Sequence, residues 1–212
     1  MTREDIEQLR PLMHGCFKYD GPYTLSSGRQ SKYYYDGKGA TQDPPTACLI
    51  GNALVDVILA SEAEAVGGLE IGAIPIADAV GIAAHVSRGV RLPTFIVRKQ
   101  PKGHGTQSQV SQANLPDGDI LLKPGRRVAI VDDVITTGGS IQQAIDVVRG
   151  LGCVVTMVVA LVERHESGGT ALRGQGFPVL RLFYTDEEGR LFIDDDVVRT
   201  AAESAGSGLL RR

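Results

Sequence analysis

Two adjacent carboxylates stand at the end of an apolar run, in the stretch VAIVDDVITTGGS of residues 128–140. Asp132 and Asp133 are followed by two threonines, two glycines and Ser140, and then a helical pattern begins. A helix N-terminus offers free amides that suit phosphate, whereas carboxylates repel it. The acids therefore suit a neutral, hydroxyl-rich group or a cation beside the phosphate, and a sugar phosphate meets both demands. The plainer alternative is that the acids cap a turn that the glycines close.

Four cationic side chains gather within the stretch FIVRKQPKGHG of residues 95–105, namely Arg98, Lys99, Lys102 and His104. Cations that meet the negative charge developing on a leaving group lower the barrier of a transfer reaction. A loop that closes over the substrate also excludes water. The long polar segment around these residues predicts a flexible lid over about residues 99–113. The alternative is an ordinary solvated basic loop.

The acidic stretch and the cationic stretch both lie within a series of alternating strands and helices, which must position them. Apolar residues at helical spacing predict one helix near residues 2–14 and a second that ends at about Ala60. From residue 65 onward, short apolar strands alternate with amphipathic helices. This alternation predicts an α/β fold with a central, mostly parallel sheet flanked by helices, with residues 1–212 as a single domain. The C-terminal stretch AAESAGSGLLRR, residues 201–212, is expected to be frayed.

The bulk composition narrows the class of protein. The net charge of -3 gives no electrostatic case for nucleic-acid binding, and no apolar run approaches the length of a membrane span. The N-terminal MTREDIEQLR is too polar for a secretory signal. Cys16, Cys48 and Cys153 are far apart, so we expect small buried residues in a reducing compartment. We therefore expect a cytoplasmic protein that binds neither nucleic acid nor membrane.

Three motifs in order carry a resemblance to a known family. VAIVDDVITTGGS resembles the phosphoribosyl pyrophosphate (PRPP) motif of the type I phosphoribosyltransferases. FIVRKQPKGHG is similar to the R-K-x-x-K-x-H-G segment of orotate phosphoribosyltransferases, and YTLSSGRQSKYYYDG, residues 23–37, resembles their N-terminal segment. The resemblance covers most of residues 2–185. It implies the type I phosphoribosyltransferase fold, with a small N-terminal hood over about residues 1–45 and a mobile lid.

The resemblance also implies an activity. It is the Mg²⁺-dependent transfer of ribose 5-phosphate from PRPP to orotate, which gives orotidine 5-phosphate and pyrophosphate in the synthesis of UMP. In the family, Mg²⁺ is held through PRPP and water, so no protein metal ligand is expected. The implied partners are PRPP, orotate and a second copy of the chain. In such a homodimer Lys99 acts within its own subunit, while Arg98, Lys102 and His104 reach the neighbouring site.

Site residues follow from matching positions. The residues with implied catalytic roles are Lys99, Lys102, His104, Asp132 and Asp133. Those with implied substrate contacts are Arg98, Val134, Ile135, Thr136, Thr137, Gly138, Gly139, Ser140, Arg164, Tyr34 and Tyr35. An arginine can meet the carboxylate of orotate with two parallel hydrogen bonds. Strand alternation prevents three consecutive tyrosines from facing one ligand, so Tyr34 or Tyr35 is expected to wall the ring.

The chain departs from the family pattern at three positions. Many members carry a Tyr-Lys pair where this chain has Ile71 and Gly72, and a lysine where it has Ser26. A cation that would help to hold pyrophosphate is therefore absent, and Glu70 stands beside the gap. Two alternatives to orotate transfer stay open on the same fold: a purine-type phosphoribosyltransferase and a PRPP-binding regulator.

Overall fold

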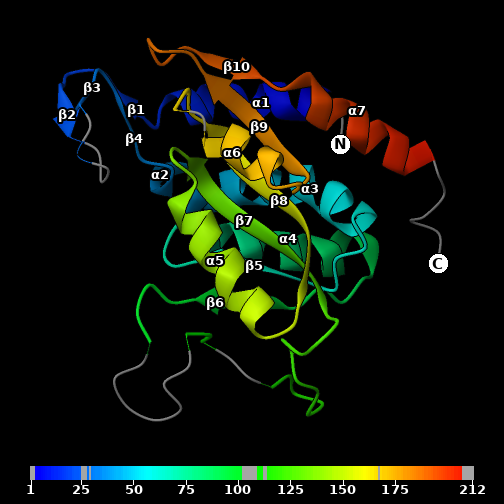
Figure 1. Ribbon diagram of the computed structural model, residues 1–212. Coiled ribbons are helices and arrows are strands. Elements are labelled where there is room, and N and C mark those ends of the chain that lie inside the picture. The colour runs from blue at the N-terminus through cyan, green and yellow to red at the C-terminus, as the bar shows by residue number, and fades with distance from the viewer. Residues whose placement is uncertain are drawn as a thin grey trace.

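The computed structural model describes residues 3–24, 28, 30–101, 109–111, 114–166 and 168–206. A six-stranded sheet forms its centre, in the order β10-β9-β8-β7-β5-β6 (Figure 1). The strands are β5 (Ala65–Leu69), β6 (Thr94–Val97), β7 (Arg127–Ile135), β8 (Val154–Glu163), β9 (Val179–Thr185) and β10 (Leu191–Ile193). All neighbouring strands run parallel except β10, which pairs antiparallel with β9. The predicted mostly parallel sheet is thus confirmed.

Helices cover both faces of this sheet (Figure 1). On one face α4 (Ala73–Arg88) packs on β5, β6 and β7, and α3 (Pro44–Ala60) packs on α4. On the other face lie α5 (Gly139–Gly150) and the short α6 (Gly168–Gly174). Because both faces are covered, the inner strands are mostly apolar, and all five residues of β5 are buried. Two apolar clusters result, one on each side of the sheet.

The N-terminal segment forms a small layer beside the carboxyl ends of the strands. It contains α1 (Arg3–His14), the paired β1 (Phe17–Lys18) and β4 (Tyr34–Tyr35), and the paired β2 (Tyr23–Thr24) and β3 (Gln30–Ser31). The short α2 (Lys38–Thr41) completes it. We call the described part of residues 1–45 the hood. The division of the chain into hood, domain and lid stays a prediction.

Two expectations about packing were wrong. The stretch from residue 201 is not frayed as far as residue 206, because it ends α7 (Asp195–Gly206), which packs on α3 through the fully buried Val197. Residues 207–212 lie outside the described chain. Cys48 is exposed on α3, whereas Cys16 and Cys153 are buried as expected.

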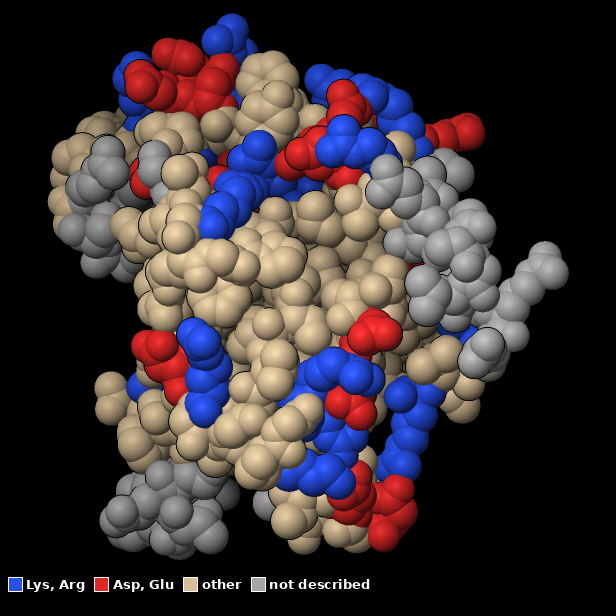
Figure 2. All heavy atoms as spheres, turned by 45° about the vertical axis from the view of Figure 1, so that its right-hand side comes forward, with Lys and Arg blue, Asp and Glu red and all other residues tan. Residues whose placement is uncertain are grey.

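The charged surface mixes both signs. The face drawn in Figure 2 carries Lys and Arg next to Asp and Glu at its upper and lower ends, with a broad uncharged area between them. Among the helices of the described chain, none combines the length and apolar character that a membrane span requires. The cytoplasmic location stays a prediction.

The topology creates one edge where functional groups meet. The chain passes from β5 to β6 on one side and then returns to β7 on the other side of β5. At such a switch point the loops after neighbouring strands diverge and leave a crevice. Glu70 follows β5, Arg98 follows β6, and Arg164 follows β8. Asp132 and Asp133 lie near the carboxyl end of β7. These residues therefore share one edge although up to 94 positions separate them in the sequence.

Candidate active site

A cavity of about 440 Å³ opens at the carboxyl ends of β5 and β7, beneath the hood. It gathers nine of the residues implicated by the sequence: Tyr34, Tyr35, Lys99, Asp132, Asp133, Val134, Thr136, Ser140 and Arg164. It also gathers seven residues not included among them: Thr24, Asp36, Lys38, Leu69, Glu70, Ile71 and Gly72. The cavity therefore brings together elements from the hood and from four segments of the α/β domain.

The two acids at the end of β7 differ in their surroundings. Asp132 is buried, accepts a hydrogen bond from the Ser140 hydroxyl at 2.6 Å, and accepts another from the Asp133 backbone N–H at 3.0 Å. Burial raises the pKa of Asp132 to about 7, and repulsion from Asp133 adds to the rise. Burial also raises the pKa of Asp133. Hydroxyl donors or a cation from a ligand would stabilise these carboxylates in their charged forms.

Two glycines bring backbone directly against the acid pair. A Cβ on Gly72 would lie 2.4 Å from Asp133 Oδ1 and 3.0 Å from Asp132 Oδ1. A Cβ on Gly37, in the hood, would lie 2.9 Å from Asp133 Oδ2. Any other residue at either position would force the acids or the backbone to move. The peptide bond between Glu70 and Ile71, just before Gly72, is cis.

The turn from Thr136 to Ser140 leads into α5. Gly138 has a positive φ of 80°, which favours glycine, and it caps the N-terminus of the helix. The Gly168 N–H donates to the Thr136 carbonyl at 3.0 Å, so the start of α6 supports the turn from outside. A 12-residue helix begins here with free backbone amides, and Ser140 and Thr136 face the cavity. The turn therefore offers the donors that an anionic group needs.

Arg164 is held in a buried position at one wall of the cavity. Its Nη2 donates to the Ser31 hydroxyl at 2.8 Å and lies 2.9 Å from the carboxylate of Glu166, while its guanidinium stacks over Tyr33. Its Nε is buried without a hydrogen-bond partner among the described residues, and so is one oxygen of Glu166. Nη2 is thus held by two partners, while the buried Nε has hydrogen-bonding capacity that no described residue uses.

The tyrosines alternate as the strand pattern required. Tyr33 is fully buried and its hydroxyl pairs with Thr185 at 2.8 Å. Tyr34 is exposed and lies close to Tyr23, with ring centroids 5.5 Å apart. Tyr35 is buried against Phe17, and its hydroxyl has no partner among the described residues. Both Tyr34 and Tyr35 line the cavity, so the structure does not choose between them.

The base of the lid is tied to the sheet and to α5. The Arg98 N–H donates to the Gln109 carbonyl at 2.7 Å, and Val97 forms an antiparallel bridge with Val110. The Gln143 side chain on α5 donates to the Lys99 carbonyl at 2.9 Å. These contacts hold both ends of the loop close together, although Lys102 and His104 lie outside the described residues.

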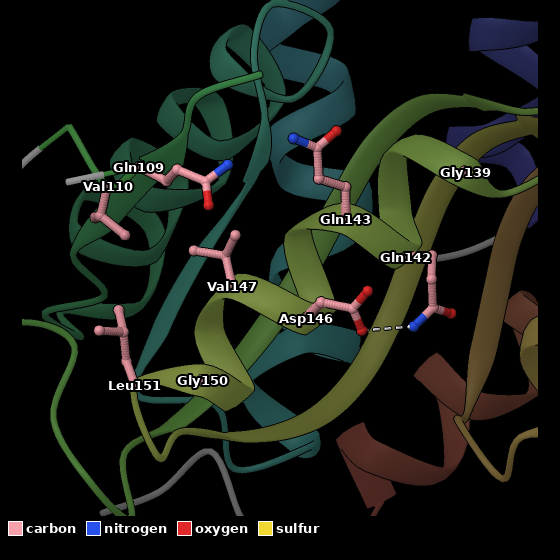
Figure 3. A pocket seen from close by; sticks show the side chains of 9 residues that line it. All are labelled: Gln109, Val110, Gly139, Gln142, Gln143, Asp146, Val147, Gly150 and Leu151. Carbon is pink, nitrogen blue, oxygen red and sulfur yellow. Dashed lines mark hydrogen bonds between the residues drawn. The ribbon is translucent and has the colours of Figure 1, made fainter. Parts of the chain in front are cut away.

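A second cavity, of about 710 Å³, lies on the outer side of this base (Figure 3). Gln109 and Val110 face Gln143 and Val147 of α5, and Leu151 just after this helix, across the cavity. Its lining, as far as the chain is described, contains carboxamides and Asp146 but no basic side chain. An anionic substrate has no counter-charge there, so the first cavity is the better candidate for a sugar-phosphate site.

Five of the residues implicated by the sequence lie beside the first cavity without lining it. Arg98 donates from its guanidinium to the Val110 carbonyl at 3.1 Å, and Ile135 is fully buried under the turn. Thr137, Gly138 and Gly139 form the outer part of the turn. The sequence did not indicate the hood residues Asp36 and Lys38 as site residues, because their charges form no periodic or repeated pattern. Only their position directly after the tyrosine strand could have indicated them.

The chain is similar to known phosphoribosyltransferases. A family model described as a phosphoribosyl transferase domain matches residues 74–171. An orotate phosphoribosyltransferase of Rhodopirellula baltica is 39% identical over 187 residues, which cover 85% of this chain and 92% of that protein. The orotate phosphoribosyltransferase of Mycobacterium tuberculosis, solved with Fe(III) dicitrate, has a TM-score of 0.69 at 30% identity and covers 88% of this chain and 99% of its own. The same protein solved in complex with PRPP has a TM-score of 0.65 at 27% identity with the same coverage. By sequence identity and coverage, the chain belongs to the orotate phosphoribosyltransferase family.

Proposed function

We propose that the protein transfers ribose 5-phosphate from PRPP to orotate in a Mg²⁺-dependent reaction and releases pyrophosphate. One observation carries the proposal. The cavity joins the adjacent acids Asp132 and Asp133 and the glycine-rich turn before α5 to Arg164, whose Nε has no partner among the described residues. The structural relative solved in complex with PRPP supports the same donor.

The donor fits the acid pair and the turn together. The ribose hydroxyls of PRPP would donate to Asp132 and Asp133, which are acceptor-only when charged. The 5-phosphate would bind the backbone amides at the start of α5 and the hydroxyls of Thr136 and Ser140. This arrangement leaves the anomeric carbon on the side of the acids that faces the 70–72 loop and the hood, because Gly72 and Gly37 both close on Asp133.

The acceptor fits Arg164 and the tyrosines. Orotate is a planar anion with a ring carboxylate, which suits the unpartnered side of the Arg164 guanidinium. Ser31 and Glu166 fix the other side, so the arginine need not reorganise when the substrate binds. The Tyr34 ring, exposed to the cavity, can wall the flat face of the base.

The reaction breaks the bond between the anomeric carbon and the pyrophosphate oxygen, and the electron pair leaves with that oxygen. A ring nitrogen of orotate forms the new bond, and its proton passes to solvent. Negative charge builds on the leaving oxygen, so Lys99 at the cavity wall and the lid cations Lys102 and His104 would lower the barrier. Because orotate is anionic already, the nitrogen needs no strong general base.

The site fits Mg²⁺ through its donor chemistry. Four carboxylates line the cavity, on Asp36, Glu70, Asp132 and Asp133, and carboxylate and water oxygens are the ligands this ion prefers. Within the described chain no three acidic, histidine or cysteine side chains gather closely enough to hold a metal. We propose that the ion is held through PRPP oxygens and water near these acids, where it would supply positive charge for the leaving pyrophosphate.

We further propose that the active form is a homodimer. Ile71, Ile82 and Val86 are 60%, 64% and 75% exposed, and the last two border an apolar groove of about 330 Å³ between α3 and α4. Ile71 also lines the active-site cavity, so one exposed apolar side chain lies at the site itself. A second copy seated there could bring its lid to the cavity. Arg98, which bonds Val110 and does not line its own cavity, fits such a shared role.

Turnover tests the activity. The protein is mixed with Mg²⁺ and PRPP, together with orotate, adenine, hypoxanthine or uracil in separate reactions. Loss of orotate absorbance without turnover of the purines supports the proposal. Turnover of a purine alone would identify a purine-type enzyme, and PRPP binding without any turnover would identify a regulator.

Complementation tests the dimer. Lys102→Ala and Asp133→Asn chains are expected to be inactive separately. Co-expressed chains that share lids across a two-fold interface would regain about a quarter of the wild-type activity, because half of the dimers carry one intact site. If each lid served its own subunit, the mixture would stay inactive.

A further inference from the structure

The cavity is poorly supplied with cations for the substrate it is proposed to bind. Its described lining carries the four carboxylates named above but only three cationic side chains, Lys38, Lys99 and Arg164. Arg164 is already neutralised by Glu166 at 2.9 Å. Ile71 and Gly72, at the end of the cavity next to Asp133, carry no charge. A pyrophosphate group at that end needs a cation from elsewhere.

Lys38 stands at that end because of how the hood meets the acid pair. Asp132 faces the phosphate turn through its bond with Ser140 at 2.6 Å. Asp133 faces the hood, since a Cβ on Gly37 would lie 2.9 Å from its Oδ2. Lys38 follows Gly37 directly and lines the same cavity. A ribose across the two acids would therefore have its 5-phosphate at the turn and its pyrophosphate towards Lys38.

The present partner of Lys38 leaves it available for a ligand. Its Nζ lies 2.7 Å from Asp36 Oδ1, and its side chain is 50% exposed. An exposed pair of this kind stabilises a fold weakly, so the ammonium group can exchange one oxygen ligand for another at little cost. Burial raises the pKa of Asp133, and the charge of Lys38 opposes that rise, which shows that its field already reaches the acid pair.

We propose that Lys38 is a substrate-binding residue that leaves Asp36 and contacts the pyrophosphate group of the ribose donor. It supplies from the hood the cation that the 70–72 loop lacks. The inference rests on the proposed function, since it assigns a contact to the donor of that reaction. It also gives the hood a role in binding the donor, besides walling the acceptor.

Lys38→Ala tests the contact in the full-length chain, with Lys18→Ala as the matched control. Lys18 is an exposed lysine of the same hood that does not line the cavity. We expect the KM for PRPP to rise about tenfold or more in Lys38→Ala, as for loss of a charge-assisted hydrogen bond, with the KM for orotate changed less than twofold. Lys38→Arg should restore most of the loss, and Lys18→Ala should match the wild type. A PRPP KM within twofold of wild type in Lys38→Ala would overturn the inference.

Chemical labelling of the wild-type protein gives a second test that needs no variant. Acetylation of lysines is followed by mass spectrometry with and without Mg²⁺ and PRPP, in the absence of orotate. PRPP should protect Lys38 and leave Lys18 unchanged, whereas equal labelling of Lys38 in both states contradicts the contact. If the wild type itself neither binds PRPP nor converts orotate, the proposed function fails. If the wild type is active while Lys38→Ala is normal, only the role of Lys38 fails.

Discussion

Replacing Asp132 by asparagine should stabilise the unliganded protein and lower its turnover at the same time. The carboxylate is 6% exposed and lies next to Asp133, so the folded state holds a charge that water would solvate better in the unfolded chain. Asparagine has nearly the same shape. Its oxygen can accept from the Asp133 N–H, and its NH₂ can donate to Ser140, which then accepts instead of donating. The substitution therefore removes the charge and keeps both contacts.

The magnitude follows from the raised pKa. Burial, with repulsion from Asp133, raises the pKa of Asp132 from 3.8 to about 7. Each pH unit of that interval corresponds to about 1.4 kcal/mol, so the charged form costs on the order of 4 kcal/mol of stability above pH 7. Below pH 4 both the folded and the unfolded wild type are protonated, and the cost vanishes. The wild type should therefore lose stability, relative to the variant, as pH rises from about 4 to about 7.

Thermal unfolding at several pH values measures this difference. For a chain of this size about 1 kcal/mol shifts the melting temperature by about 2–4 °C, so Asp132→Asn should melt roughly 10 °C above the wild type at pH 8 and close to it at pH 4.5. Asp146→Asn, an exposed acid on α5, is the matched control and should show no pH-dependent gain. Turnover in Asp132→Asn should fall about 10- to 100-fold, because a ribose hydroxyl loses its charged acceptor. An advantage that is equal at both pH values, or a less stable variant at pH 8, would refute the reasoning.

Three further outcomes can be measured on the same protein. Arg164→Lys should raise the KM for orotate about 10- to 100-fold, because the paired hydrogen bonds are lost. Steady-state kinetics should show an unchanged KM for PRPP, and a rise in the PRPP KM alone would contradict the assignment. Gly72→Ala should lose turnover at least about tenfold through its contact with Asp133, while Gly150→Ala, where an added Cβ meets nothing within 4 Å, should keep its activity. Removal of Mg²⁺ with EDTA should abolish turnover reversibly, and circular dichroism of the unliganded protein should not change; unfolding on chelation would point to a structural metal instead.

The parts of the fold that local sequence encodes were predictable. The acid pair was recognisable because an apolar strand, two carboxylates and a glycine-rich turn are contiguous from Val128 to Ser140. The alternation of strands and helices gave the sheet, since its inner strands are buried on both faces. The C-terminal helix was missed because few apolar residues mark it, and Val197 is buried where this helix packs on α3 and β9.

Contacts that depend on tertiary packing could not be predicted in the same way. The orientation of Arg164 depends on Ser31, which is 133 positions away, and on Tyr33 beneath it. Lys38 lies near the acid pair because Gly37 packs closely on Asp133, and no sequence pattern in the hood predicts this packing. A charge without periodic neighbours carries no local signal, so its role emerges only once the hood is packed on the domain.

Gly37 of the hood packs so closely on Asp133 of the α/β domain that an added Cβ would lie 2.9 Å from the Asp133 carboxylate. The two layers therefore meet at the place where the ribose would bind. A sugar phosphate held by the β7 turn on one side and by hood residues on the other would fasten the two layers together. Filling the site would then slow the local opening of the whole hood, which hydrogen exchange would report as protection that extends from β4 and α2, beside the ligand, to β1. In this protein, substrate would serve as part of the tertiary structure for as long as it stays bound.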